Sequence, residues 1–318
     1  MTTRADCPAM PTLTIAICTY NRSERLPSLV SALRAQECDL PFDILFVDNN
    51  STDNTADVLD RLAQEPGAPL RHVRELQQGI THARNRSIEE SLGYDYMVVM
   101  DDDEVPMPGF IRAAVSALRD EGAECVGGRV HVRFDPVPRP AWLEDNLLGF
   151  LAEVNHGTSS KWVEDNTTPI WTCNVAYRTT LFRDGLRFDQ RYNRKGKDIG
   201  GGEDAMMFQA LLDRKTKMRY RADMVVEHYV EPWRLNRLYF LKVHYLSGFK
   251  TGFYEFSRYH RESFGVPLFL FPQLARHAFT TLKMYATGKP SALRQAMNMT
   301  HAMGLVAGCF ARWRRAEG

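Results

Sequence analysis

Four consecutive acidic residues, 101–104, directly follow the apolar segment 96–100. A short apolar segment of this kind is typical of a strand buried on both faces of a parallel sheet. The acids would then lie at the carboxyl end of the strand, where open α/β sheets bind ligands. A divalent cation would offset their mutual repulsion, because hard cations prefer several oxygen ligands. Asp101 and Asp103 can point at one ion while Asp102 points elsewhere; the alternative is a solvated acidic turn.

A second pair of acids, Glu203 and Asp204, follows three glycines at 200–202. The glycines indicate a mobile loop that ends where a helix begins. Acids in a first helical turn are favoured by the helix dipole, which is the alternative to a functional role. His228 ends a later strand-like segment. A lone histidine is usually structural, but in a chain suspected of binding a metal it is a candidate ligand.

Segments with strand and helix patterns alternate through the first half of the chain. The predicted strands are 13–18, 42–47, 70–74, 96–100 and 124–132, and the predicted helices are 24–36, 55–64, 79–92 and 108–121. This alternation predicts βαβ units, and therefore an α/β fold with a mostly parallel central sheet flanked by helices. Polar residues at strand ends, Thr19 to Arg22 and Asp48, would line one edge of it. Neither G-x-G-x-x-G nor a P-loop pattern occurs, which argues against a dinucleotide cofactor and a P-loop.

The second half of the chain begins with an excursion from the sheet. Prolines 136, 138 and 140 indicate this excursion, and the chain is predicted to return as strands at 170–177 and 218–226. Trp171 and Asn174 lie on the first of these strands. From residue 232 onward the pattern is helical, over 233–257, 267–285 and 292–315. We therefore expect one domain at 1–232 and a helical C-terminal extension at 233–318.

Charge is distributed unevenly along the 318 residues, although the formal net charge is only +1. That overall value argues against a nucleic-acid partner. Residues 263–316 hold seven Lys or Arg and no Asp or Glu, whereas residues 1–262 hold 33 basic and 38 acidic residues, a net charge of −5. Trp313 lies among Arg312, Arg314 and Arg315, an arrangement that suits the headgroup region of an anionic leaflet. The alternative is that these helices cap the domain at 1–232 or form an oligomer contact.

The six cysteines show no C-x-x-C spacing or paired pattern, which is typical of a reduced, cytosolic protein. Neither a signal peptide nor an apolar segment of about 18 residues is evident. We therefore expect a cytoplasmic protein that contacts the cytoplasmic face of the membrane peripherally through residues 263–316.

Five motifs in order resemble the family-2 glycosyltransferases, which are inverting enzymes of the GT-A (Rossmann-like) fold. They are Cys18-Thr19-Tyr20-Asn21-Arg22, Val47-Asp48-Asn49-Asn50-Ser51-Thr52-Asp53, Gly79 with Ala83-Arg84-Asn85, Asp101-Asp102-Asp103, and Gly202-Glu203-Asp204. Each motif alone is weak, but their common order and spacing over residues 12–250 are specific. The resemblance implies transfer of a sugar from a nucleotide-diphosphate sugar to the hydroxyl of a glycan or lipid-linked acceptor in cell-surface polysaccharide synthesis. It also implies dependence on Mg²⁺ or Mn²⁺.

The family pattern implies a role for each matching residue. The residues implied to bind the nucleotide sugar are Thr19, Tyr20, Arg22, Asp48, Arg84, Asp101 and Asp102. Asp103 would bind the metal directly, with His228 in the metal shell. Asp204 would be the catalytic base, and Glu203, Asn174 and Trp171 would lie on the acceptor side.

The sequence departs from the family pattern at Thr172, where the family often has glycine, and this affects the expected shape of the acceptor pocket. No Gln-x-x-Arg-Trp motif follows residue 204, so a processive synthase of the cellulose or chitin type is not expected. Two other functions remain open. A sugar-phosphate nucleotidyltransferase would share the α/β layer and the acids, but usually has a glycine-rich loop after the first strand. A non-catalytic carbohydrate-binding or scaffold protein would not need Asp103 and Asp204 together.

Overall fold

The computed structural model describes residues 12–195, 199 and 201–317 of the chain, which form two compact units. The first unit comprises 12–133, 152–195 and 203–229, and the second comprises 134–151 and 230–317 together with Ile199, Gly201 and Gly202. Gly200, one of the three glycines expected to form a mobile loop, lies outside the described residues. The predicted boundary at 232 falls close to the start of the C-terminal part of the second unit. The sequence did not indicate that residues 134–151 belong with the C-terminal helices.

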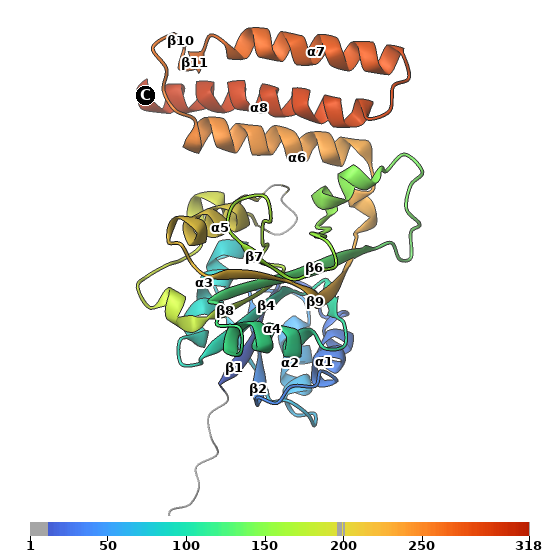
Figure 1. Ribbon diagram of the computed structural model, residues 1–318, viewed down its shortest axis with the longest axis vertical. Coiled ribbons are helices and arrows are strands. Elements are labelled where there is room, and N and C mark those ends of the chain that lie inside the picture. The colour runs from blue at the N-terminus through green and yellow to red at the C-terminus, as the bar shows by residue number, and fades with distance from the viewer. Residues whose placement is uncertain (1–11, 196–198, 200, 318) are drawn as a thin grey trace, which may run out of the picture. The chain divides into compact units, whose positions relative to one another are not determined.

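A nine-stranded sheet forms the centre of the first unit (Figure 1). Its strands are β1 (Leu13–Thr19), β2 (Phe42–Asp48), β3 (Leu70–Arg74), β4 (Tyr96–Asp101), β5 (Glu104–Pro106), β6 (Cys125–Arg133), β7 (Lys161–Val163), β8 (Asn174–Arg178) and β9 (Met218–Tyr229). The order is β3-β2-β1-β4-β8-β6-β9-β5, with β7 paired to β9. The half formed by β3, β2, β1 and β4 is parallel, as is the β6–β9 pair. The pairings of β8 with β4 and β6, and of β9 with β5 and β7, are antiparallel.

Helices cover both faces of this sheet. Alternate side chains of its central strands point to opposite faces, so they are buried in two separate apolar cores. Ile15 and Ile17 of β1 belong to one apolar core, and Ala16 belongs to the other. The first core includes α1 (Leu26–Arg34), α2 (Thr55–Ala63) and α4 (Phe110–Arg119). The second includes α3 (Ile80–Ser91) and α5 (Glu203–Asp213). The α/β fold with a helix-flanked central sheet is therefore confirmed. Among the described strands, antiparallel pairings are as numerous as parallel ones, so the sheet is mixed rather than mostly parallel.

The strand order reverses next to β1, and this reversal determines where a site can form. The chain passes from β1 outward to β2 and β3, then returns to place β4 on the other side of β1. The carboxyl ends of these two parallel strands therefore lie side by side at a switch point, which is where open α/β sheets bind ligands. Cys18 pairs with Asp101 at this end. Thr19 and the acidic turn after β4 are consequently neighbours.

The strand predicted at 170–177 begins later than expected. The backbone N–H of Asn174 donates a hydrogen bond to the Trp171 carbonyl at 3.1 Å, closing a turn just before β8. Ile170 packs over Gly127 of β6, where an added Cβ would lie 2.3 Å from Ile170 Cγ2. The apolar residues before Asn174 are therefore buried as a turn packed on the sheet, which apolar patterning alone does not distinguish from a strand.

The second unit contains three long helices with α8 between α6 and α7 (Figure 1). They are α6 (Arg237–Lys250), which continues as a π-helical turn (Thr251–Glu255), α7 (Leu270–Ala286) and α8 (Ala292–Glu317). The short strands β10 (Glu262–Ser263) and β11 (Val266–Pro267) precede α7, and helical turns occur at Asp145–Leu151 and Pro232–Arg234. Trp142 packs edge-on against Phe240 of α6, which explains why residues 134–151 belong to this unit. The helical C-terminal extension is confirmed.

Glycines allow α6 and α8 to approach until backbone meets backbone. Gly248 and Gly252 face α8, and Gly304 and Gly308 face α6, each pair four residues apart. A Cβ added at Gly304 would lie 2.0 Å from the Tyr245 carbonyl oxygen, and one at Gly308 would lie 2.1 Å from that of Phe249. Small residues at this spacing are typical of helix pairs in close contact.

We expect Gly308→Val to destabilise the helical unit, because its side chain can fit only if the α6 and α8 backbones separate. Overpacking of this kind costs about 1–3 kcal/mol. Gly149→Val is the control, since a Cβ at Gly149 meets nothing within 4 Å. The measurement is the free energy of unfolding of the full chain in denaturant. Equal stabilities for the two variants would contradict the close packing of α6 on α8.

His244 is held in its neutral form inside the helical unit. Its Nε2 lies 3.0 Å from Arg294 Nη1, and its Nδ1 lies 3.1 Å from the Phe240 carbonyl. Because arginine can only donate, Nε2 must accept and Nδ1 must carry the proton. Burial and the neighbouring Arg294 lower the pKa of His244 to about 4, with His301 acting in the same direction.

This lowered pKa predicts acid sensitivity of the helical unit. The unfolded chain protonates His244 near its ordinary pKa of about 6.5, whereas the folded chain resists protonation. The contribution to stability is therefore complete above pH 6.5 and is lost as pH falls toward 4. His244→Gln should flatten the pH dependence of the melting temperature over this interval, whereas His260→Gln, at an exposed histidine, should not. Parallel curves for wild type and His244→Gln would contradict the assignment.

Candidate active site

The reversal of strand order brings the end of β1 against the acidic turn after β4. The Thr19 hydroxyl donates a hydrogen bond to Asp102 Oδ2 at 2.7 Å, and Arg22 Nε lies 3.9 Å from Asp102 Oδ1. Burial, reinforced by the charge of Asp103, raises the pKa of Asp102 to about 7. Three residues predicted to bind the nucleotide sugar therefore meet here. Tyr20 follows β1 directly and is half-buried.

The loop after β2 is held by Asp48 and by two asparagines, Asn21 and Asn49, to which the sequence assigned no individual role. Asp48 is buried at the end of β2, and its Oδ1 accepts a hydrogen bond from Ser51 N at 2.9 Å. Asn21, at a positive φ of 51°, accepts from Thr52 N at 2.8 Å and so ties the β1 loop to the β2 loop. Asn49 Oδ1 accepts from Gly79 N at 2.7 Å, which fixes the start of α3. Asparagines in loops after strands are the only sequence signal for these roles.

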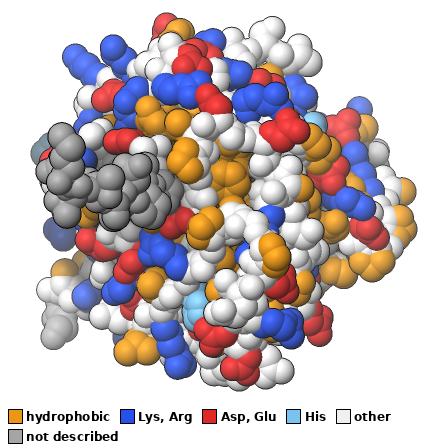
Figure 2. Space-filling model, turned by 90° about the horizontal axis from the view of Figure 1, so that it is seen from below, with side chains coloured by type: hydrophobic (Ala, Val, Ile, Leu, Met, Phe, Trp, Pro, Cys, Tyr) orange, Lys and Arg blue, Asp and Glu red, His pale blue; other side chains and the backbone are white. Residues whose placement is uncertain are grey.

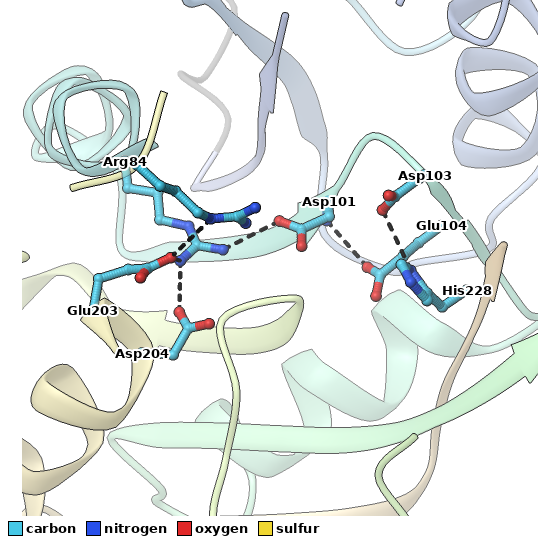
Figure 3. Close-up of polar contacts among 8 residues, drawn as sticks. Arg84, Asp101, Asp103, Glu104, Glu203, Asp204 and His228 are labelled. Carbon is cyan, nitrogen blue, oxygen red and sulfur yellow. Dashed lines mark hydrogen bonds and ion pairs between the residues drawn. The ribbon is translucent and has the colours of Figure 1, made fainter. Parts of the chain in front are cut away.

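Pairing of β5 with β9 places Asp103 beside His228, although 124 other residues separate them in the chain. Tyr229 N donates to the Asp103 carbonyl at 3.0 Å, and Glu104 is the register partner of His228. The Asp103 Oδ1 and His228 Nδ1 atoms lie 3.3 Å apart, and both residues are more than nine-tenths buried (Figure 3). The structure thus brings the two predicted metal ligands together.

Glu104 points inward and has a structural role. It is 1% exposed, and its Oε2 accepts a hydrogen bond from Asp101 N at 3.1 Å, which closes the turn between β4 and β5. Burial, with the charges of Asp101 and Asp103, raises the pKa of Glu104 well above its ordinary value. The four acids therefore differ in environment, and Asp102, Asp103 and Glu104 carry an electrostatic cost that a cation would reduce.

Arg84, on α3, joins the acidic turn to the start of α5. Its Nη2 donates to Asp101 Oδ1 at 3.3 Å, and its Nη1 donates to Asp204 Oδ1 at 2.6 Å and to Glu203 Oε1 at 3.1 Å (Figure 3). The side chain is almost completely buried. Burial opposes its charge, but Asp204, Asp101 and Glu203 outweigh that effect and raise the pKa of Arg84 well above its ordinary value. Its guanidinium thus binds three protein carboxylates. The sequence had implied a contact with the nucleotide sugar and did not indicate these ion pairs.

Glu203 and Asp204 differ sharply in exposure, although they are adjacent. Glu203 is 1% exposed, and its carboxylate lies between Arg84 and Arg194. Burial, together with Asp204, raises the pKa of Glu203. The first turn of α5 directs Glu203 inward. Its acceptor-side position stays a prediction. The Asp204 side chain is 28% exposed and is therefore accessible to a ligand.

Asn174 and Trp171, also predicted on the acceptor side, have packing roles in this structure. Asn174 Nδ2 donates to the Arg129 carbonyl at 2.8 Å and to the Met224 carbonyl at 3.0 Å. These bonds bridge the register shift between Gly128 and Arg129 in the β6–β9 pairing. Trp171 is half-buried and lies against Phe208 of α5. Both residues therefore support the sheet and the helix that carries Asp204.

The donor set at the acidic turn fits a divalent cation only in part. Within the described residues, no group of three or more His, Cys, Asp or Glu side chains forms a metal site. The 3.3 Å between Asp103 Oδ1 and His228 Nδ1 is close to the spacing of about 3 Å between adjacent octahedral ligands at bond lengths near 2.1 Å. Mg²⁺ typically uses one or two protein ligands together with substrate phosphates, and imidazole also suits transition metals. The residues thus fit a cation that a diphosphate helps to hold.

On the face of the molecule shown in Figure 2, Lys and Arg are interspersed with Asp and Glu. Outside the grey atoms, that view contains no extended surface of one charge. A surface of mixed sign does not generate the broad positive potential by which proteins attract polyanions.

Comparison with known proteins agrees with this fold. Residues 14–186, more than half of the chain, match the sequence profile described as "Glycosyl transferase family 2". The chain therefore belongs to glycosyl transferase family 2.

Curated relatives resemble only part of the chain. The succinoglycan biosynthesis protein ExoM of Rhizobium meliloti is 25% identical over 62% of this chain and 60% of its own length. The PGL/p-HBAD biosynthesis glycosyltransferase of Mycobacterium tuberculosis is 31% identical over 39% of this chain and 49% of its own length. This chain thus spans about half to three fifths of these two relatives.

Two solved structures share the fold over nearly the whole chain. The mannosyltransferase PcManGT from Pyrobaculum calidifontis, in complex with GDP-Man and Mn²⁺, aligns with a TM-score of 0.59 and 18% identity, covering 95% of this chain and 87% of that one. Residues 1–349 of S. aureus TarS, in complex with UDP, align with a TM-score of 0.53 and 16% identity, covering 96% and 92%. At these identities the likeness establishes the fold.

We expect Arg84→Lys to lower turnover by about 100-fold, because a single ammonium cannot bridge Asp101 and Asp204 and small displacements of reacting groups cost that much. Arg86→Lys is the matched control, since Arg86 lies on the same helix and pairs at the surface with Glu90. Arg84→Met should instead cost about 3–5 kcal/mol of stability, because it leaves buried carboxylates without their cation. Steady-state kinetics and thermal unfolding measure the two effects. Wild-type turnover in Arg84→Lys would contradict the positioning role.

Proposed function

We propose that this protein transfers a sugar from a nucleotide-diphosphate sugar to an acceptor hydroxyl with inversion at the anomeric carbon. The observation that carries the proposal is the link through Arg84 between Asp101, at the acidic turn, and Asp204, at the start of α5. Through these two hydrogen bonds, Arg84 would connect Asp101 on the donor side to the accessible Asp204 carboxylate on the acceptor side. Membership of glycosyl transferase family 2 supports the same reaction class.

In the proposed reaction, the acceptor oxygen attacks the anomeric carbon as the bond from that carbon to the diphosphate oxygen breaks. The bonding electron pair leaves with the nucleoside diphosphate, and Asp204 takes the proton of the acceptor hydroxyl. General-base assistance of this kind contributes about 10²–10⁴-fold. Arg84 holds the Asp204 carboxylate by the oxygen at 2.6 Å, which orients the base toward the acceptor.

The remaining site residues would bind the donor. Asp48, Thr19, Tyr20 and Arg22 lie at the ends of β1 and β2 and would contact the nucleoside, with Asp101 and Asp102 beside the sugar and diphosphate. Asp103 and His228 would hold Mg²⁺ or Mn²⁺ with the diphosphate. When bound, that cation would neutralise charge developing on the leaving group as a Lewis acid.

The donor is tested by measuring nucleotide release from a panel of UDP- and GDP-sugars, because neighbours of the same fold are described with UDP and GDP-Man. We expect release from one donor class in the presence of Mn²⁺ or Mg²⁺. Release from none, with a correctly folded protein, would contradict the proposal. Incorporation of a sugar-1-phosphate into a nucleotide sugar would instead favour a nucleotidyltransferase, and sugar binding without turnover would favour a non-catalytic carbohydrate-binding protein.

The acceptor is proposed to be a glycan or a lipid-linked saccharide in cell-surface polysaccharide synthesis. The relative ExoM is named for succinoglycan biosynthesis, which supports a glycan product. The first unit would bind the donor and perform the transfer.

Residues 263–316 of the second unit would contact the cytoplasmic face of the membrane, where lipid-linked acceptors reside. Their seven cations support this contact, since each is worth about 1 kcal/mol near an anionic leaflet before screening. Within the described part of the chain, no helix is both long and apolar enough to cross a bilayer.

A further inference from the structure

One side of α7 carries apolar side chains that are exposed in the structure. Residues 271, 275, 278, 282 and 285 recur at intervals of three or four, so they form one stripe along the helix. With Phe279 beside it, this surface consists of Phe271, Ala275, Ala278, Phe279, Leu282 and Tyr285, and we call it the α7 apolar face. Phe279 is 69% exposed and Leu282 is 70% exposed, although both are large apolar residues.

The opposite side of α7 packs on α8, so the apolar face is directed away from the interior of the unit. Leu270 and Thr281 are buried. Thr281 Oγ1 lies 3.4 Å from the carbonyl of Gln295, and Gln295 Nε2 lies 3.1 Å from His277 Nδ1. Polar groups therefore line part of the contact of α7 with α8, beside buried Leu270, while several large apolar side chains face outward.

Cations flank the α7 apolar face. Arg276 and Lys283 are both exposed and lie seven residues apart, so they project in similar directions two turns apart, next to the stripe. Lys289 is exposed just beyond the end of the helix. No acidic residue occurs between 263 and 316. The surface thus combines an apolar centre with a positive edge, which complements an apolar layer bordered by negative charge.

A second copy of the chain complements this surface poorly. Pairing two α7 faces would bring two sets of Arg276 and Lys283 into one interface, with no acid from the same segment to neutralise them. A lipid leaflet supplies anionic head groups at the depth of the cations and hydrocarbon at the depth of the apolar face. With 17 residues, α7 is also of a length that can lie in the plane of the interface.

We infer that α7 is an in-plane membrane helix, whose apolar face enters an anionic leaflet while Arg276 and Lys283 bind its head groups. This inference rests on the proposed membrane contact of residues 263–316 and narrows it to one face of one helix. The proposed docking surface does not include Trp313, whose ring packs against Phe264 and Phe310 within the unit.

The test is sedimentation of the full chain with vesicles of phosphatidylcholine alone or mixed with phosphatidylglycerol. Wild type should bind the mixed vesicles, and high salt should weaken the binding. Phe279→Ser with Leu282→Ser should lower the partition coefficient at least about tenfold, because both apolar side chains leave the leaflet. Arg276→Glu with Lys283→Glu should abolish the preference for phosphatidylglycerol. Leu238→Ser is the matched control, since Leu238 is 75% exposed but lies on α6, and it should bind like wild type.

Three outcomes would overturn the inference. They are wild type remaining in the supernatant with mixed vesicles, α7 variants that sediment like wild type, and an equal loss in Leu238→Ser. A concentration-dependent dimer of wild type that the α7 substitutions dissociate would assign the face to a second copy instead.

Measuring nucleotide release from the donor alongside vesicle binding distinguishes a failure of the membrane inference from a failure of the proposed function. The α7 variants should retain wild-type release, because the site residues lie in the first unit. Vesicle binding without nucleotide release by wild type would leave the docking inference intact and would contradict the glycosyltransferase proposal.

Discussion

Replacing Asp204 by asparagine should lower turnover at least about 100-fold while donor affinity stays close to that of the wild type, because the amide cannot accept the acceptor proton. The substitution preserves the size of the side chain and its Oδ1, so it can keep the hydrogen bond from Arg84 Nη1. The fold and the position of α5 should therefore be unchanged. Initial rates and donor titration by calorimetry separate the two quantities.

The matched control for this experiment is Asp213→Asn, at the other end of the same helix. Asp213 is exposed and accepts a hydrogen bond from Gln209, outside the site. It should turn over at the wild-type rate. An Asp204→Asn enzyme with wild-type turnover would exclude Asp204 as the base.

Replacing Asp103 by alanine should abolish transfer, since it removes the carboxylate that lies 3.3 Å from His228. Chelation of wild type with EDTA should inhibit it reversibly, and added Mn²⁺ or Mg²⁺ should restore activity. Binding of Mn²⁺ in the presence of the nucleoside diphosphate, followed by electron paramagnetic resonance, provides a readout independent of turnover. Asp103→Ala should lose this binding, because only His228 of the proposed pair remains.

Asp120→Ala serves as the control for general effects of removing a carboxylate, since Asp120 pairs at the surface with Arg119 at the end of α4. It should bind Mn²⁺ and turn over like wild type. Full activity of the wild-type protein in EDTA would be incompatible with the metal role of Asp103 and His228.

Local patterns predicted the parallel half of the sheet well. Apolar segments such as 13–18 and 96–100 are short, continuous and followed by polar turns, and in the structure β1 and β4 occupy the centre of the sheet. The reversal of strand order next to β1 then determines that Thr19 meets Asp102. The sequence indicated this edge because polar residues follow several strands, although it could not identify the individual contacts.

Contacts between distant segments could not be predicted from local patterns. Arg84 lies 119 and 120 residues from Glu203 and Asp204, and only the packed fold buries it between them. The same burial turns Glu203 inward, which the sequence did not indicate. The family pattern implies an acceptor-side position for Asn174, whereas no sequence pattern reveals that its amide bridges a register shift.

The direction in which a helix faces is another property that the sequence leaves open. The apolar residues of 267–285 are compatible with a buried helix or with one that faces outward. Contacts of α7 with α8 place Leu270 and Thr281 inside and leave Phe279 and Leu282 outside. The basic charge of the segment was visible in the sequence, but its position along one edge of an apolar face depends on the structure.

The anomeric configuration of the first product tests the central proposal most directly. The reaction would use an α-linked nucleotide sugar identified by the release screen and a hydroxyl acceptor, with the product analysed by nuclear magnetic resonance before any secondary reaction. A single displacement assisted by Asp204 predicts a β-linked product. An α-linked product would contradict the proposal, because attack on the face opposite the leaving diphosphate must invert the anomeric carbon.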